Sequence, residues 1–451
     1  MTDFLTAINS FVWGTPTLLL IFFTGVILTL RTNFFQIRFF GAAFKSFFKT
    51  SQIKNGKKLT PFQSASTALS ATMGTGNIVG VAGAVALGGP GAVFWMWVSA
   101  FLGMITKYAE AALAVRYRTR NGANELVGGP MYMIRDGLGE KWKWLAAIYS
   151  FFGVIAAFGV GNATQINTLI SSVNDVIVLS GHTPTLAGNI GMGVILAILV
   201  VMMLLGGAKR IGTVAERLVP FAAVLYIFLS GYVLIVNAPA IPQVLGNIVR
   251  GAFSPHAVTG GVVGSMIQSL RIGTSRGVFT NEAGMGTAGI AHSAANVSHP
   301  AEQGLMGIVE VFLDTIVICT MTALVILCSG VVIPYGTDTG IQLTNQAFSS
   351  VFGNWIRVPI TLSVCCFAFA TILGWGLYGA RCAQYLFGHN AWKPFVLLQA
   401  VTVVAGAVLG TGTIWLLAET VNGLMAIPNL IALFYLAPEF AALSREYEQI
   451  Y

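Results

Sequence analysis

Polar residues and glycines interrupt an apolar run at residues 72–77, where the sequence is Thr-Met-Gly-Thr-Gly-Asn. Gly74 and Gly76 weaken a helix because glycine has the most backbone freedom to lose. The two threonines and the asparagine bring polar side chains to the same point. Inside a bilayer, irregular backbone is tolerated only where protein buries it or where it lines a cavity. The stretch therefore predicts a broken helix that holds something small and polar.

No arrangement of residues typical of an enzyme occurs in the sequence. The spacing Gly284-x-Gly286-x-x-Gly289 matches a dinucleotide fingerprint, but no predicted strand precedes it and no βαβ unit surrounds it. There is no phosphate-binding loop, no zinc-type His/Glu motif and no nucleophile–base pair. His292 is expected as a polar residue in or beside a membrane span. We expect neither catalysis nor an organic cofactor.

Composition places the chain in a lipid bilayer. Hydrophobic residues make up 55% and charged residues only 9% of the sequence, whereas a soluble domain carries roughly 25% charged residues. A membrane-spanning helix needs about 20 apolar residues, so this chain has room for about eleven. The net charge of +8 is interpreted as a topology signal and not as evidence for nucleic acid. The five cysteines lie in apolar runs and are predicted to be packing residues.

The apolar runs predict an all-α polytopic fold with its basic loops on one face. The spans are expected at about 11–30, 62–87, 91–116, 143–172, 189–207, 213–236, 270–290, 304–330, 355–381, 394–417 and 419–438. Segment 31–60 is rich in lysine and arginine without an acid, so the positive-inside rule makes it cytoplasmic. Asp3 precedes the first span and Arg31 follows it, unlike a signal peptide. We therefore predict an outer N-terminus and a cytoplasmic C-terminus.

A second interruption lies 210 residues after the first. Gly284 and Gly286 repeat the spacing of Gly74 and Gly76, and a proline, Pro90 or Pro300, ends both segments. Span 62–87 runs outward and span 270–290 runs inward, so the two units are predicted to be inverted repeats, which are common in transporters. The expected division is an N-terminal helix with a basic loop (1–60), a first five-helix repeat (61–240) and a second five-helix repeat (241–451).

Several polar or aromatic residues within the spans are candidates for function. Glu282 and Asp314 are ionisable at membrane depth, where such residues are functional by default. The alternative for Glu282 is a structural role, in which it pairs with a cation or stays neutral. Asp314 is either an ion ligand or a structural hydrogen-bond acceptor. Gln165 has either a packing role between helices or a substrate contact. Thr371 and Trp375 are four apart and share a helix face, with packing as the alternative for Trp375.

Two sequence motifs resemble those of the alanine or glycine:cation symporter family. Residues 88–103 (GGPGAVFWMWVSAFLG) resemble its signature, and residues 281–286 (NEAGMG) resemble its second hallmark. The similarity extends over nearly the whole chain. It implies a prokaryotic membrane protein with a LeuT-type 5+5 inverted repeat, two broken helices and an extra N-terminal helix.

The resemblance also implies a substrate site at the two breaks. In the LeuT-type pattern, free N–H groups of the first broken helix receive the substrate carboxylate, as expected where half-helices expose unpaired donors. Together with the candidates above, the expected substrate-binding residues are Thr72, Thr75, Gly76, Gln165, Phe279, Thr280, Asn281, Met285, Thr371 and Trp375. A wall of Phe279, Met285 and Trp375 leaves room for a small side chain, but it is the family resemblance that implies alanine or glycine.

Sodium is the coupling ion that the resemblance implies. The expected ligands are Ser70, Thr72, Met73, Asn77, Thr280, Asp314 and Thr371. Sodium prefers oxygen ligands, and broken helices expose carbonyl oxygens. A second sodium site in the pattern uses two adjacent hydroxyls, but here Ala370 and Ile372 flank Thr371, which puts a complete second site in doubt.

The sequence thus predicts a sodium-coupled symporter that imports alanine and glycine across a prokaryotic cell membrane by alternating access. One alternative is a proton-coupled carrier that uses Glu282 or Asp314 as its proton site. Another is an amino-acid sensor of the same fold that transports nothing. A channel would need a continuous polar lining, which isolated breaks in apolar helices do not provide.

Overall fold

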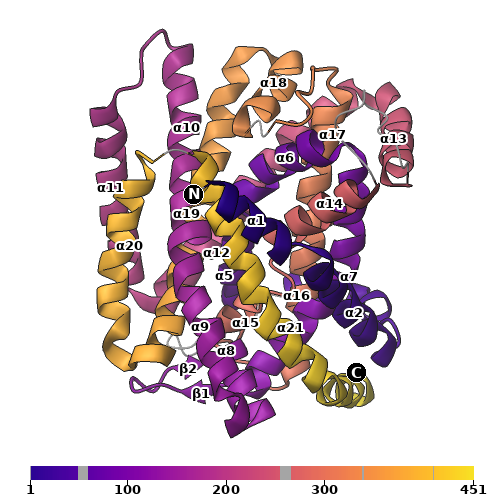
Figure 1. Cartoon of the computed structure of the whole chain (residues 1–451), viewed down its shortest axis with the longest axis vertical. Helices are drawn as coiled ribbons and strands as arrows, with labels where there is room; N and C mark the ends of the chain where they lie inside the picture. Colours follow the sequence, from indigo (N-terminus) through magenta and orange to yellow (C-terminus); the bar gives the residue numbers. More distant parts are fainter. Residues whose placement is uncertain (1, 49–58, 254–265, 338–339, 410, 451) are drawn as a thin grey trace.

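The computed structural model describes residues 2–48, 59–253, 266–337, 340–409 and 411–450. The described chain is almost entirely helical, and its two short strands, β1 (Thr119–Arg120) and β2 (Leu126–Val127), form one antiparallel hairpin. Most of the long helices run roughly along the long axis of the molecule (Figure 1). This all-α architecture confirms the predicted fold class.

The helices follow the predicted spans and add shorter elements between them. Their bounds are α1 Thr2–Val12, α2 Thr15–Arg31, α3 Phe35–Arg38, α4 Phe40–Phe48, α5 Pro61–Thr72, α6 Val79–Gly88, α7 Gly91–Arg116, α8 Pro130–Tyr132, α9 Lys143–Phe158, α10 Thr164–Leu179, α11 Leu186–Leu204, α12 Gly207–Val236, α13 Ile241–Phe253, α14 Met266–Asn281, α15 Thr287–His292, α16 Pro300–Val311, α17 Thr320–Cys328, α18 Gly340–Phe352, α19 Arg357–Phe387, α20 Trp392–Gly406 and α21 Thr411–Ile450. Two helices, α13 and α18, lie in segments that the sequence assigned to outer loops. They form because each buries an apolar face, α13 against α7 and α18 against α6 and α17.

Most predicted spans have a matching membrane-length helix. Within the described ranges, eight helical stretches are long and apolar enough to cross a membrane, and the bent pair formed by Pro61–Thr72 and Thr75–Gly88 makes a ninth. The other two predicted spans fall short of that standard. One is α20, which has 15 residues, and the other is α14 with α15, a polar helix followed by a break and a short helix. These two spans, and with them the total of eleven, therefore stay a prediction.

The predicted boundary between the last two spans is wrong. It was placed near residue 418, but α20 ends at Gly406 and α21 runs without a break from Thr411 to Ile450. Glu419 lies in α21 directly after that predicted boundary, and an isolated carboxylate is costly in the hydrocarbon core. In the structure it lies inside the bundle, where its Oε1 is 2.7 Å from Nη1 of Arg276. The ion pair allows the helix to continue through this point.

Two helices are broken at the centre of the bundle. The first is bent by 55° between Pro61–Thr72, which is α5, and Thr75–Gly88, which ends in α6. In the second, α14 and α15 are separated by residues 282–286. The halves pack crosswise, α14 against α6 and α15 against α5. This is the contact pattern expected when two broken helices run in opposite directions.

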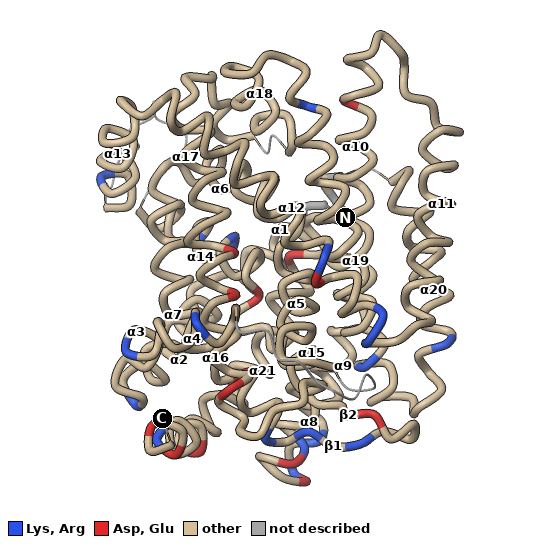
Figure 2. Tube along the Cα trace, turned by 180° about the vertical axis from the view of Figure 1, so that it is seen from behind, with Lys and Arg blue, Asp and Glu red and all other residues tan. Residues whose placement is uncertain are grey.

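Charge is distributed unevenly along the bundle. Lys and Arg gather at the end that carries α8, the β1–β2 hairpin and the C-terminus, and few lie at the end with α13 and α18 (Figure 2). At the basic end, acidic side chains pair with some of them: Glu439 with Arg116, Glu448 with Arg38 and Asp136 with Arg135. The arrangement agrees with the predicted single basic face. Its assignment to the cytoplasm stays a prediction.

Candidate functional site

The first break is a tight, buried turn built around Gly74. Gly74 has extended backbone angles, and Thr75–Asn77 form a single 3₁₀ turn before α6 begins. The Gly74 N–H donates to Asn77 Oδ1 at 3.0 Å, which holds the turn closed. A Cβ on Gly74 would lie 2.7 Å from Thr371 Oγ1 and 3.2 Å from Gln165 Oε1. Only glycine lets α10 and α19 approach the unwound backbone this closely.

Gln165 supplies a fixed oxygen acceptor to this break. Its Oε1 accepts from both the N–H (3.2 Å) and the hydroxyl (3.0 Å) of Thr75. Its Nε2 donates to the Val160 carbonyl in the π-helical turn that precedes α10, so the amide is held at both ends. The Thr75 N–H and hydroxyl that donate to this amide oxygen would suit a carboxylate oxygen equally well.

Asn77 connects the first break to the second through a buried polar chain. Its Nδ2 donates to Asp314 Oδ1 at 2.6 Å, and Asp314 Oδ2 accepts from the Thr315 hydroxyl at 2.8 Å. The Thr315 hydroxyl in turn accepts from Asn281 Nδ2 at 3.1 Å, at the end of α14. Asp314 is fully buried in the π-helical segment Phe312–Cys319. Amide, hydroxyl and carboxylate oxygens of this kind suit a hard cation such as sodium.

The second break has strained backbone and internal partners. Glu282, Gly284 and Gly286 all have positive φ, at 57°, 96° and 77°, which glycine tolerates and glutamate adopts at a cost. Glu110 Oε1, from α7, accepts from the N–H groups of Gly284 (2.8 Å) and Gly286 (3.0 Å). It also accepts from Asn429 Nδ2 of α21 at 2.8 Å. The free amides of this break are therefore already bound by the protein.

Phe279 closes the space beside the first break. A Cβ on Gly76 would lie 3.3 Å from the Phe279 ring and 3.4 Å from Thr280 Cγ2. The Phe279 ring packs on Trp415 with centroids 5.4 Å apart. Trp415 also lines a cavity of about 500 Å³ together with Val79, Thr168, Arg276 and Glu419. The two aromatic rings thus separate this cavity from the unwound backbone.

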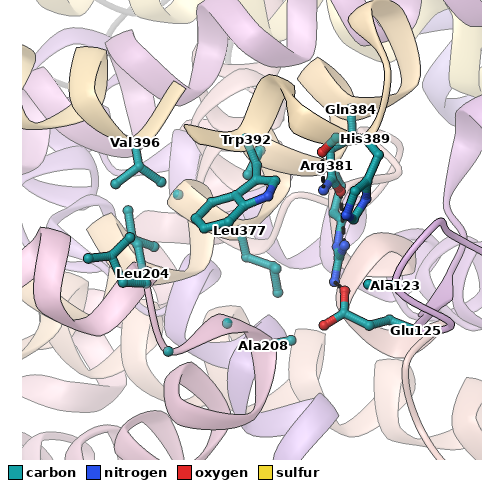
Figure 3. A pocket seen from close by; sticks show the side chains of 15 residues that line it. Ala123, Glu125, Leu204, Ala208, Leu377, Arg381, Gln384, His389, Trp392 and Val396 are labelled. Carbon is teal, nitrogen blue, oxygen red and sulfur yellow. Dashed lines mark hydrogen bonds and ion pairs between the residues drawn. The ribbon is translucent and has the colours of Figure 1, made fainter. Parts of the chain in front are cut away.

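A smaller cavity of about 270 Å³ lies near the basic end of the bundle. Figure 3 shows an apolar side, which includes Leu204, Trp392 and Val396, and a polar side around Arg381. Arg381 Nη2 lies 2.9 Å from Glu125 Oε2, which ties α19 to the β1–β2 hairpin. This ion pair lies far along the bundle from the two breaks.

The structure brings most of the sequence-predicted site residues together. Around the first break lie Ser70, Met73, Thr75, Gly76, Asn77, Gln165, Phe279, Thr280, Asp314 and Thr371. Thr371 donates its hydroxyl to the Ser70 carbonyl at 2.9 Å, and the Thr72 hydroxyl donates back into α5. Asn281 and Met285 belong to the second break, whereas Trp375 fills a notch at Gly161.

Other buried charged residues were missed from the sequence. Lys107 and Glu110 lie fully buried in α7 and bind the second break. Glu310 was also missed. Its Oε1 lies 3.0 Å from Nε2 of His292, the residue expected in or beside a membrane span, and both residues are buried. The sequence signal that could have revealed them is the presence of charged residues inside predicted spans 91–116 and 304–330. Among the described residues no cluster of three or more His, Cys, Asp or Glu side chains could hold a metal ion.

Two broken helices that meet at the centre of an inverted repeat define a secondary transporter. The chain belongs to the sodium:alanine symporter family, whose model matches residues 1–451. It is 41% identical to the sodium/alanine symporter AgcS of Methanococcus maripaludis, over 98% of this chain and 96% of that protein. It is 34% identical to the probable sodium/glutamine symporter GlnT of Bacillus subtilis, over 95% and 87%.

The solved structure of MhsT in complex with L-phenylalanine has the same fold. The TM-score is 0.56 at 14% identity, and the alignment covers 86% of this chain and 98% of MhsT. This likeness confirms the LeuT-type fold that the resemblance implied. The chain is therefore a sodium-coupled amino-acid symporter and not an enzyme.

Removing the Glu110 carboxylate is expected to destabilise the second break. Glu110→Leu leaves the Gly284 and Gly286 N–H groups without their acceptor, while Asn429 Nδ2 keeps only the Gly284 carbonyl. We expect the free energy of unfolding to fall by about 3 kcal/mol. Thermal unfolding of the detergent-purified protein measures this change. Glu110→Gln, which keeps an acceptor oxygen, should lose much less, and equal stability of Glu110→Leu and wild type would contradict the assignment.

Proposed function

We propose that this symporter imports small neutral amino acids, alanine and glycine, together with sodium. The observation that carries the proposal is the first break, where Thr75 donors meet Gln165 within reach of the Asn77–Asp314 pair. A carboxylate suits the Thr75 N–H and hydroxyl, and sodium suits the adjacent oxygens. Phe279 lies close to Gly76, where a Cβ would be 3.3 Å from its ring, and this closeness favours a substrate with a small side chain.

In this proposal the residues at and beside the two breaks have two sets of roles. Substrate binding falls to Thr72, Thr75, Gly76, Gln165, Phe279, Thr280, Asn281, Met285, Thr371 and Trp375, and sodium binding to Ser70, Thr72, Met73, Asn77, Thr280, Asp314 and Thr371. Transport proceeds by alternating access, in which repeats 61–240 and 241–451 move around the two breaks. The protein lies in a prokaryotic cell membrane with its basic end, and thus its C-terminus, in the cytoplasm.

The amino acids named for related transporters differ in size. The relative GlnT is named for glutamine, and MhsT holds phenylalanine, so the fold accepts larger side chains. Here the Phe279 ring is pinned between Gly76 and Trp415. Enlarging the site would require both aromatic rings to move, which favours alanine and glycine.

Uptake of labelled amino acids into proteoliposomes tests the proposed function. We expect alanine and glycine to accumulate only with an inward sodium gradient, and unlabelled glutamine and phenylalanine to compete weakly. A membrane potential alone should drive no uptake without sodium. Accumulation under a pH gradient in sodium-free buffer would instead establish a proton-coupled carrier, and saturable binding without flux would establish a sensor.

Gln165→Glu is expected to block the carboxylate position. The substitution keeps an oxygen acceptor opposite Thr75 but adds a negative charge where the substrate carboxylate would bind. Like charges side by side cost several kcal/mol, so the KM for alanine should rise by at least about tenfold. The matched control is Gln342→Glu in α18, which makes the same substitution at an exposed position. An unchanged KM in Gln165→Glu would remove Gln165 and Thr75 from the substrate site.

A further inference from the structure

One face of α7 runs along the second break. Gly103, Lys107, Glu110 and Ala114 follow one another at spacings that share a helix face. Lys107 Nζ donates to the Asn281 carbonyl, at the last residue of α14, at 2.7 Å. Glu110 holds the amides on the far side of the same break. A single helix face therefore supplies a positive group to the carbonyl side and a negative group to the amide side.

Space for Lys107 is built into the neighbouring helix. The side chain is fully buried, and a buried ammonium is costly unless it is paired. A Cβ on Gly307 of α16 would lie 3.0 Å from both Cγ and the carbonyl oxygen of Lys107, so a glycine at that position leaves room for the lysine stem and for the α7 backbone. The charge of Lys107 interacts with the buried carboxyl groups of Glu110, Glu282 and Asp314.

In transporters with broken helices, the carbonyl ends of half-helices are the places where coupling cations bind. The last carbonyls of α14 lack helical partners, and that end of the helix carries partial negative charge. We propose that Lys107 is a resident cation that occupies the carbonyl end of the second break in place of a co-transported ion. The proposal rests on the import of alanine and glycine with sodium proposed above. It adds that the first break binds the transported cation and the second break a cation of the protein itself.

The two breaks then have different tasks. The carbonyl and amide groups of the second break are bound by Lys107 and Glu110, so this break stays filled throughout transport. Sodium and the substrate carboxylate both bind at the first break, beside Asn77 and Thr75. Lys107 is thus a positioning residue that sets how many sodium ions the protein requires.

Sodium dependence of alanine uptake in variants of the full chain tests this inference. Lys107→Met removes the charge but keeps an unbranched side chain of similar length. We expect the Hill coefficient for sodium to rise by about one and the half-saturating sodium concentration to rise by about tenfold, because a free ion must now fill the break. Lys107→Arg keeps the charge and should retain the wild-type Hill coefficient. Thr106→Val, a neighbouring α7 substitution that removes only a hydrogen bond within the helix, serves as the matched control.

The outcomes separate the two proposals. Sodium-independent uptake by the wild type would defeat the proposed function before any variant is compared. A Lys107→Met protein that transports more slowly but with wild-type sodium dependence would overturn the resident-cation role alone. If Lys107→Met does not fold, Gly307→Ala pushes Lys107 and the α7 backbone that carries it away from α16 without removing the charge. Its half-saturating sodium concentration should rise by about threefold. An unchanged value in that variant would equally overturn the inference.

Discussion

Unpaired backbone groups inside a membrane are the constraint on which this structure depends. Each broken helix exposes N–H and C=O groups, and in a medium without water each of them needs a partner. The chain satisfies the two breaks in different ways. At the second break, charged side chains from α7 bind the backbone directly. At the first break the partners are neutral, and the amide oxygen of Gln165 faces Thr75. A ligand can replace a neutral partner at lower cost than a buried, paired charge.

Glycines around the first break allow its neutral partners to approach the backbone closely. Gly74 allows Thr371 and Gln165 to approach the unwound backbone, and Gly161 admits Trp375 beside α10. Phe279 reaches Gly76 for the same reason. The space next to the break is therefore defined by side chains from α10, α14 and α19, elements that lie far apart in the sequence. Small shifts of these helices would open or close it, which suits a site that works by alternating access.

Much of the fold could be predicted because its signals are local. Apolar runs marked the helices, glycine pairs marked both breaks, and Gln165 stood out as an amide deep in an apolar span. The boundary near residue 418 was wrong because the spans were assigned from local apolar runs. The ion pair between Glu419 and Arg276, which is 143 residues away, allows α21 to continue through that point. Lys107 and Glu110 were missed because they lie towards the basic end of α7. Only the packing of α7 against the second break reveals that both are buried.

A high-resolution structure determined with alanine and sodium tests the central claim most directly. The claim is that the first break binds both solutes while the second stays filled by the protein. We predict the alanine carboxylate at the Thr75 and Gly76 amides and sodium beside Asn77 and Asp314, with Lys107 and Glu110 still bound to the second break. A carboxylate on the Gly284 and Gly286 amides, with Glu110 displaced, would contradict the account.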